Sequence, residues 1–262
     1  HHANALYNLD RYAEALGAFK RIAKESRNEG LRMMARYQAA WSYRHLKKES
    51  SAVDEFARFL KDYPKSEMAN DVRFWFGEYY RSKGKYDKAR ESFSAVLEGP
   101  AENDIANEAL YQLAITLAEE GRTNEAIARF KELAARSSEE PLKRTAYRRI
   151  ALLEKAKRDY SSAIDNLRKA LDANENTELN AQIQYEIAEI FEENGSYIEA
   201  SQEYLKVPYL YPKGSFWAVR AMLKCALVFE RLEKWDEARR LYEKLAAMDV
   251  EESKFAKGRL EW

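Results

Sequence analysis

The chain has 262 residues, of which 46% are hydrophobic and 34% are charged, so it can bury a core. Its 44 basic and 44 acidic residues give a formal net charge of zero, which removes the electrostatic argument for a nucleic-acid or anionic-membrane partner. Only nine glycines and five prolines interrupt the sequence, too few for the many tight turns of an all-β protein, and this favours an all-α chain.

Three residues recur in a fixed pattern along the chain. The first is an alanine that returns in steps of 37 residues, five times, and then 38: Ala15, Ala52, Ala89, Ala126, Ala163, Ala200 and Ala238. Twelve residues before each alanine stands a second small residue: Ala3, Ala40, Gly77, Ala114, Ala151, Ala188 and Ala226. Four residues after each alanine stands a large one: Phe19, Phe56, Phe93, Phe130, Leu167, Tyr204 and Tyr242. Small residues let two antiparallel helices approach closely and large ones fill the space beside them, so the pattern predicts seven helical hairpins.

The same pattern predicts the individual helices in chain order. They are expected near 11–25, 34–46, 50–62, 70–82, 86–98, 106–119, 123–136, 142–156, 160–172, 180–193, 197–210, 217–231 and 235–247. Aromatic residues open five of the second helices of these hairpins: Tyr12, Tyr86, Tyr160, Tyr197 and Trp235. Glycines end three of the first helices, and we expect the left-handed conformation at Gly84, Gly121 and Gly195.

Proline marks the ends of several second helices. Pro64, Pro100 and Pro212 lie at or just beyond such ends, where proline stops a helix without breaking it. Pro208 falls inside the predicted helix 197–210, and we expect a bend there.

The order of small residue, small residue and large residue resembles that of tetratricopeptide repeats over essentially the whole chain, although the unit is longer than usual. The resemblance implies an all-α fold, a right-handed superhelical solenoid forming a single domain over residues 1–262. Its units would lie near 1–33, 34–69, 70–105, 106–141, 142–179, 180–216 and 217–250, with a terminal helix at 251–262.

Two segments resemble a narrower group within that family. Tyr63-Pro64-Lys65-Ser66 and Gly84-Lys85-Tyr86-Asp87-Lys88-Ala89 look like repeats of bacterial envelope proteins, namely the periplasmic coordinator of the Tol-Pal system and the lipoprotein of the barrel-assembly complex. This resemblance implies a bacterial, periplasmic or envelope-associated protein. A cytoplasmic location is the alternative.

The sequence contains little that suggests catalysis. His45 is expected to be a surface or turn residue, and the single cysteine, Cys225, a buried apolar residue. We expect no enzyme activity, no metal and no cofactor, because neither a metal-binding spacing nor a phosphate-binding loop occurs. Acidic pairs such as Glu192-Glu193 are expected to be solvated helix ends. No apolar run reaches the roughly 18 to 20 residues that span a membrane, so direct membrane insertion is not expected.

Partner-binding residues can be proposed from the resemblance, because first helices line the concave side of a tetratricopeptide array. Outward positions would lie three residues before, one after and four after the small residue of each first helix. The candidates at these positions are Tyr37, Trp41, Arg44, Phe74, Glu78, Arg81, Tyr111, Arg148 and Tyr185. Aromatic and arginine side chains are enriched at interfaces. For Tyr37, Phe74, Tyr111 and Tyr185, packing between neighbouring repeats is an equal alternative.

The predicted function is a non-enzymatic scaffold that holds a protein or peptide in its concave groove. Trp41, Glu78 and Ile115 stand where chaperone-binding relatives would have asparagine, so capture of chaperone tails is not expected. One alternative is self-assembly into a homo-oligomer, because apolar residues continue at helical spacing in the last ten positions. Another is a regulatory region of a larger protein. RNA binding is disfavoured by the zero net charge.

Overall fold

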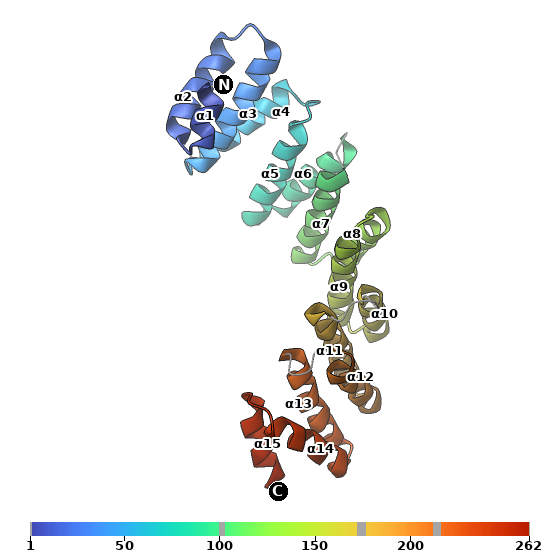
Figure 1. Cartoon of the computed structure of the whole chain (residues 1–262). Helices are drawn as coiled ribbons and strands as arrows, with labels where there is room; N and C mark the ends of the chain where they lie inside the picture. Colours follow the sequence, from blue (N-terminus) through green and yellow to red (C-terminus); the bar gives the residue numbers. More distant parts are fainter. Residues whose placement is uncertain (1, 100–102, 172–176, 212–215, 262) are drawn as a thin grey trace. The chain divides into compact units, whose positions relative to one another are not determined.

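The computed structural model describes residues 2–99, 103–171, 177–211 and 216–261, and the regular secondary structure of these ranges is entirely α-helical. The helices are α1 (His2–Asn8), α2 (Tyr12–Glu25), α3 (Glu29–His45), α4 (Glu49–Asp62), α5 (Ala69–Ser82), α6 (Tyr86–Glu98), α7 (Asn103–Glu119), α8 (Thr123–Arg136), α9 (Glu140–Ala156), α10 (Tyr160–Ala170), α11 (Glu178–Glu193), α12 (Tyr197–Leu210), α13 (Phe216–Arg231), α14 (Trp235–Ala246) and α15 (Glu252–Leu260) (Figure 1). The predicted all-α repeat fold is confirmed.

Most helix ends lie close to their predicted positions. The exception is α3, which begins at Glu29 rather than near residue 34. Asn28 explains the difference, because its side chain accepts a hydrogen bond from the Leu31 backbone N–H and caps the helix. Residue 172, the predicted end of α10, lies outside the described residues.

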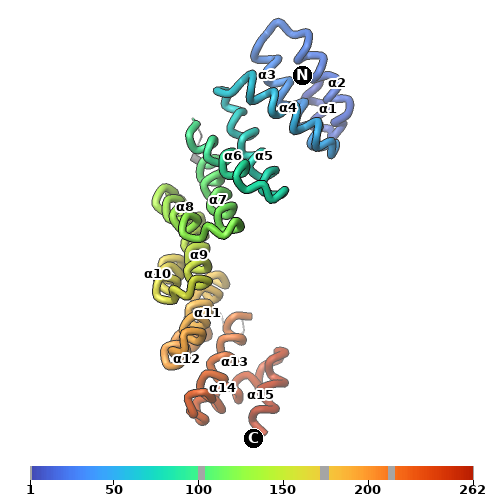
Figure 2. The backbone as a smooth tube through the Cα atoms, turned by 180° about the vertical axis from the view of Figure 1, so that it is seen from behind, coloured from blue at the N-terminus to red at the C-terminus, as the bar shows by residue number. Residues whose placement is uncertain are grey.

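The chain divides into two compact units, residues 1–120 and residues 121–262. The division falls between α7 and α8, inside the predicted fourth repeat. Within each unit successive helices pair as antiparallel hairpins, such as α5 with α6 and α13 with α14 (Figure 2). No helix of the described residues is both long enough and apolar enough to cross a bilayer. A single domain over residues 1–262 stays a prediction.

Within each unit the repeated small and large residues lie where paired helices meet. Every member of the three predicted sets is buried. At Gly77 on α5 the approach leaves no room for a side chain, because an added Cβ would overlap the ring of Phe93 on α6. The sequence prediction of close helix pairs built on small residues is therefore confirmed.

The hairpin turns share one backbone conformation. Gly84, Gly121 and Gly195 have φ angles of 68°, 82° and 78°, so the predicted left-handed glycines are confirmed. The other four turns place a left-handed residue at the same position, although none is a glycine: Asp10, Lys47, Arg158 and Glu233, with φ between 56° and 62°. The left-handed residue is thus common to all seven predicted turns, whichever residue occupies the position.

Proline has two different roles in the described residues. Pro64 follows the end of α4 at Asp62, as predicted. Pro208 lies inside α12, which continues through it to Leu210, so the helix is not ended there. The bend at Pro208 stays a prediction, and Pro100 and Pro212 lie outside the described residues.

Candidate protein-binding surface

Tyr37 on α3 is half-buried and tied to the neighbouring repeat. Its hydroxyl donates a hydrogen bond to Oδ2 of Asp71 on α5 at 2.9 Å, and its ring centre lies 5.6 Å from that of Phe59. Burial is the main cause that raises the pKa of Tyr37 above its ordinary value, and the hydrogen bond to Asp71 adds to it. The structure therefore shows the packing role that was one of the two alternatives for Tyr37.

Trp41 and Arg44 follow on the same helix. The Trp41 ring packs edge-on against Phe56, with 5.1 Å between ring centres. Arg44 is exposed, and its guanidinium carbon lies 5.1 Å from the centre of the Trp41 ring. Such a stacked arginine keeps its hydrogen-bond donors available at the surface.

The three candidates on α5 differ in exposure. Phe74 is half-buried and packs edge-on against Phe93 at 5.5 Å between ring centres. Glu78 is exposed and forms no ion pair within the described residues. Arg81 donates a hydrogen bond from Nη1 to Oε1 of Glu119 at 3.1 Å. Of this group, Glu78 is the side chain most open to a partner.

In the second unit the candidates are engaged within the protein. Arg148 donates a hydrogen bond from Nη2 to Oε1 of Glu186 on α11 at 2.7 Å. Tyr185 is only 4% exposed, and its ring packs between those of Tyr204 and Trp217. The structure places Tyr185 in the core, and a partner-binding role for it stays a prediction. In the first unit Tyr111 on α7 is half-buried, and a partner-binding role for it also stays a prediction.

Three of the candidates meet at one concavity, which we call the α3–α5 hollow. It measures about 620 Å³ and is lined by Arg44, Lys47, Glu49, Ala52, Trp75, Glu78, Tyr79, Arg81 and Ser82. Trp75 and Tyr79 stack at 5.3 Å between ring centres and form an aromatic wall. These two residues were missed because only the three outward positions of each first helix were counted.

The charges of the α3–α5 hollow are partly compensated. Lys83 pairs with Glu49 at 3.1 Å, and Arg81 is paired as described above. Within the described residues Arg44, Lys47 and Glu78 form no ion pair. The hollow thus offers free charges of both signs beside an aromatic wall. This combination suits a polar peptide.

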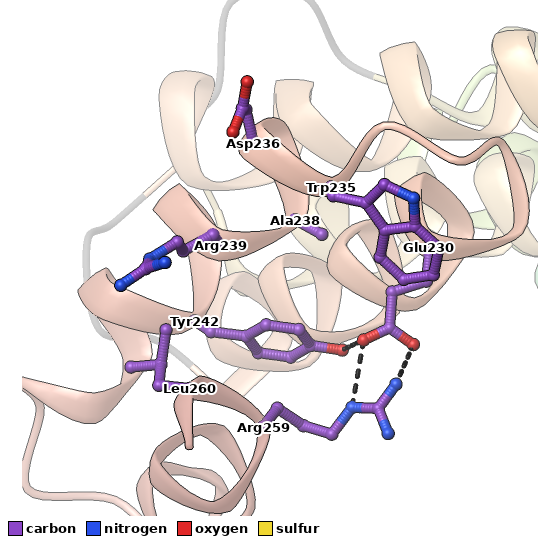
Figure 3. A pocket seen from close by; sticks show the side chains of 8 residues that line it. All are labelled: Glu230, Trp235, Asp236, Ala238, Arg239, Tyr242, Arg259 and Leu260. Carbon is purple, nitrogen blue, oxygen red and sulfur yellow. Dashed lines mark hydrogen bonds and ion pairs between the residues drawn. The ribbon is translucent and has the colours of Figure 1, made fainter. Parts of the chain in front are cut away.

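A second concavity lies in the other unit, and we call it the α13–α15 hollow (Figure 3). It measures about 540 Å³ and is lined by Glu230, Trp235, Asp236, Ala238, Arg239, Tyr242, Arg259 and Leu260. The Glu230 carboxylate accepts hydrogen bonds from the Tyr242 hydroxyl at 2.9 Å and from two nitrogens of Arg259. Burial is the main cause that raises the pKa of Tyr242 to about 12, and the hydrogen bond to Glu230 adds to it. This hollow was not predicted from the sequence.

The titratable residues that were considered for catalysis are stacked, buried or hydrogen-bonded within the protein. His45 stacks on Tyr12 at 4.3 Å between ring centres. Cys225 is fully buried, as predicted, and burial raises the pKa of its thiol to about 12. The prediction for Glu192 is wrong: its carboxylate accepts the Tyr204 hydroxyl at 2.7 Å, and its side chain is only 17% exposed. No cluster of three metal-binding side chains occurs within the described residues.

Comparisons with known proteins agree with this architecture. Family models described as tetratricopeptide repeat match residues 34–66, 74–141, 148–215 and 221–254. One of these models alone, at 74–141 and 148–215, covers more than half of the chain. No curated protein matches the sequence. None of these matches supports the narrower likeness to the Tol-Pal coordinator or the barrel-assembly lipoprotein.

Solved structures share the fold at low sequence identity. A crystal structure of MamA protein is 22% identical, covers 72% of this chain and 97% of its own, and superposes with a TM-score of 0.53. PilF of Pseudomonas aeruginosa is 17% identical, covers 88% of this chain and 97% of its own, with a TM-score of 0.50. At these identities the likeness shows the helical repeat architecture alone.

Proposed function

Because the chain belongs to the tetratricopeptide repeat family, we propose that it is a protein-interaction scaffold that binds a peptide segment of a partner in the α3–α5 hollow. Repeat folds of this family are suited to protein–protein interaction and are generally non-catalytic. One observation carries the proposal: the hollow gathers three of the predicted binding residues, Arg44, Glu78 and Arg81, beside an aromatic wall.

The chemistry of the hollow favours a peptide over a small apolar ligand. Arg44 and Glu78 are exposed and lie on two different helices, so they can bind side chains of opposite charge along one extended or helical segment. Trp75 is 7% exposed and stacks on Tyr79, which gives the segment a rigid apolar contact. Free charges on a fixed aromatic support are typical of protein interfaces.

A pull-down from extracts of the source organism tests this proposal. The informative variant is Arg44→Ala with Glu78→Ala, because both side chains are exposed and their joint removal leaves the net charge unchanged. Tyr37 and Trp41 are unsuitable, since both pack against neighbouring rings. The control is Arg21→Ala with Glu25→Ala on α2, a charge-neutral exposed pair outside the hollow.

We expect the wild type and the α2 variant to retain the same partner. The hollow variant should bind that partner at least about tenfold more weakly, because roughly two hydrogen bonds to charged groups are lost. Equal retention by all three proteins would refute binding in the α3–α5 hollow. Circular dichroism of each variant checks that helicity is unchanged.

For the cellular setting we propose the bacterial envelope. The support is the sequence likeness of Tyr63-Pro64-Lys65-Ser66 and of residues 84–89 to repeats of envelope scaffolds. Fractionation of the source organism, with an antibody against the chain, tests this setting. Recovery only in the cytoplasmic fraction would refute it.

A further inference from the structure

First helices of neighbouring repeats meet at two fixed positions. The residue four places after the small residue of one repeat contacts the residue five places after the small residue of the next, 38 positions along the chain. Contacts of this kind within the described residues are Tyr7 with His45 at 5.5 Å between ring centres, Arg81 with Glu119 at 3.1 Å and Lys155 with Glu193 at 2.6 Å. The repeat geometry therefore brings these two positions together in both units.

Arg44 stands at the first of these positions in the second repeat, but the residue 38 places later is Ser82. Where the cation is Arg81 or Lys155, a glutamate stands there instead. The Ser82 hydroxyl carries no charge, and it donates its hydrogen bond to the Tyr79 carbonyl oxygen at 2.8 Å. Arg44 therefore lacks the carboxylate that its two counterparts have.

The Arg44 guanidinium is nevertheless held in place. Its carbon lies 5.1 Å from the centre of the Trp41 ring, which itself packs on Phe56. Within the described residues Arg44 forms no hydrogen bond and no ion pair. A guanidinium stacked on a ring keeps its donors free at its edge, and it loses little further side-chain freedom when it binds a carboxylate.

The place that a glutamate would fill belongs to the α3–α5 hollow, because Arg44 and Ser82 both line it. Both side chains are exposed, so a partner can reach the guanidinium. Lys47 is a second exposed cation of the same hollow that forms no ion pair within the described residues. Its charge adds to the attraction of a carboxylate.

The acidic side chains of the hollow do not prevent such a contact. Glu49 is already paired, and Glu78 is the acid that an incoming carboxylate would meet. Glu189 stands at the position of Glu78 in the sixth repeat, and the ion pair of Lys155 with Glu193 forms there all the same. A glutamate one turn away is thus compatible with a cation–carboxylate pair at these positions.

We propose that the segment bound in the α3–α5 hollow carries an internal glutamate or aspartate, whose carboxylate binds Arg44 at the place that Glu119 takes beside Arg81. The inference rests on the proposed function and names the partner chemistry of that site. The carboxylate accepts hydrogen bonds from the guanidinium edge, as in other arginine–carboxylate pairs. Because the two precedents are side-chain carboxylates, the free C-terminus of a partner is not required.

The first test supplies the carboxylate within the full chain. Ser82→Glu should pair with Arg44, so a double-mutant cycle with Arg44→Ala should show a coupling of about two- to fivefold in the unfolding equilibrium constant, as exposed ion pairs provide. Ser82→Gln, which has the same shape and no charge, should show no such coupling. Urea unfolding measures all variants. Absence of coupling for Ser82→Glu would overturn the proposal, because position 82 would not reach Arg44, and would leave the proposed function standing.

The second test uses peptides. A random library, fused at its C-terminus to a phage coat protein so that no free terminal carboxylate is present, is selected on the wild-type chain. Peptides lost by the Arg44→Ala, Glu78→Ala variant and kept by the Arg21→Ala, Glu25→Ala control are synthesised with amidated C-termini. Replacement of their acid by its amide should weaken binding to the wild type at least about tenfold and should have little further effect on Arg44→Ala. Ser82→Glu should bind the acidic peptides at least about fivefold more weakly than Ser82→Gln, since its own carboxylate occupies Arg44.

The outcomes separate this inference from the proposed function. Peptides specific to the hollow that bind equally well with amides in place of every acid would overturn the inference alone. A selection that yields no peptide lost by the hollow variant would refute peptide binding in the α3–α5 hollow, and the inference with it.

Discussion

Four of the hairpin turns hold a residue other than glycine in the left-handed conformation. For a residue with a Cβ this conformation is unfavourable by roughly 1 to 2 kcal/mol. The rest of the hairpin must supply that free energy. Packing of the paired helices does so, which explains why the turn keeps its geometry when its glycine is absent.

Two opposite substitutions in adjacent turns test this explanation. Gly195 has φ of 78° and open space around it, so Gly195→Ala should lower the free energy of unfolding by about 1 kcal/mol through backbone strain alone. Arg158 is exposed and has φ of 62°. Arg158→Gly should therefore leave the free energy of unfolding unchanged or raise it by up to about 1 kcal/mol. Urea denaturation measures both, and the same sign for the two changes would contradict the argument.

Glu154 is a buried acid in the second unit. It is 5% exposed, and Asn166 donates a hydrogen bond to its Oε2 at 2.8 Å. Burial raises the pKa of Glu154 above its ordinary value, and the Asn166 bond opposes this only in part. At pH values between the ordinary pKa and the raised one, the native state holds a proton that the unfolded chain has lost. The free energy of unfolding therefore falls as pH rises across that window.

Glu154→Gln should remove this loss. The amide can still accept the Asn166 hydrogen bond but carries no charge to bury. We expect the variant to gain stability over the wild type as pH rises above about 4.3, the ordinary pKa of glutamate, and to be more stable at pH 7. Urea unfolding from pH 4 to pH 8 measures the difference. The exposed Glu199→Gln serves as control and should show no such trend.

At the scale of helix pairs, the close approach of α5 and α6 depends on the absence of a Cβ at Gly77. Three ring atoms of Phe93 would lie within 2.6 Å of it, and Phe93 is fully buried. Gly77→Ala should therefore cost about 1 to 3 kcal/mol through overpacking. The fifth repeat combines Ala151 with Leu167 at the corresponding positions, so Phe93→Leu should recover part of the loss in the double variant. Additive effects in a double-mutant cycle would refute this coupling.

Two helix pairs in the second unit replace the buried phenylalanine by tyrosine and supply a carboxylate for its hydroxyl. Tyr204 donates to Glu192, and Tyr242 donates to Glu230, with the partners twelve residues apart in each pair. Where the large residue is Phe56 or Phe93, the position of the glutamate is held by Arg44 or Arg81. A buried hydroxyl needs a partner, which explains the pairing.

Tyr204→Phe measures this contact. We expect a loss of about 1 to 3 kcal/mol, because a hydrogen bond to a carboxylate is removed while Glu192 stays largely buried. The matched control is Tyr209→Phe on the same helix, where the ring is 86% exposed and no loss is expected. Chemical denaturation followed by circular dichroism compares them, and equal stability of the two variants would refute the role of the pair.

At the scale of the whole chain, each compact unit has its own buried clusters. Phe56 and Phe59 belong to a cluster of the first unit, whereas Tyr204 and Tyr242 belong to a cluster of the second. Repeat proteins gain stability from contacts between neighbouring elements, so damage in one unit should stay largely local.

Phe56→Ala should therefore loosen one unit selectively. Removal of this fully buried ring costs about 3 to 5 kcal/mol. Hydrogen exchange measured by mass spectrometry should show faster exchange across α3, α4 and α5 and unchanged protection in α11 to α14. Equal acceleration in both units would show that the chain unfolds as one cooperative body.

The sequence alone predicted the order of the helices from α2 to α14 and most of their ends, because small residues, large residues and turn residues act over a few positions and repeat seven times. It missed the start of α3 at Glu29, which depends on the Asn28 cap. It also identified the buried triads and Cys225. The left-handed turns at Lys47, Arg158 and Glu233 could not be predicted, since no local preference of lysine, arginine or glutamate favours this conformation. Only the surrounding helix pair imposes that conformation.

The tertiary structure alone decided which candidates are accessible. Counting positions along a helix identifies a face, but whether that face is open depends on side chains from the next repeat. Tyr185 is covered by Trp217, and Arg148 is engaged by Glu186, whereas Arg44 and Glu78 remain exposed at one hollow. The α13–α15 hollow depends on the contact of Arg259 on α15 with Glu230 on α13, residues 29 positions apart that no periodicity brings together.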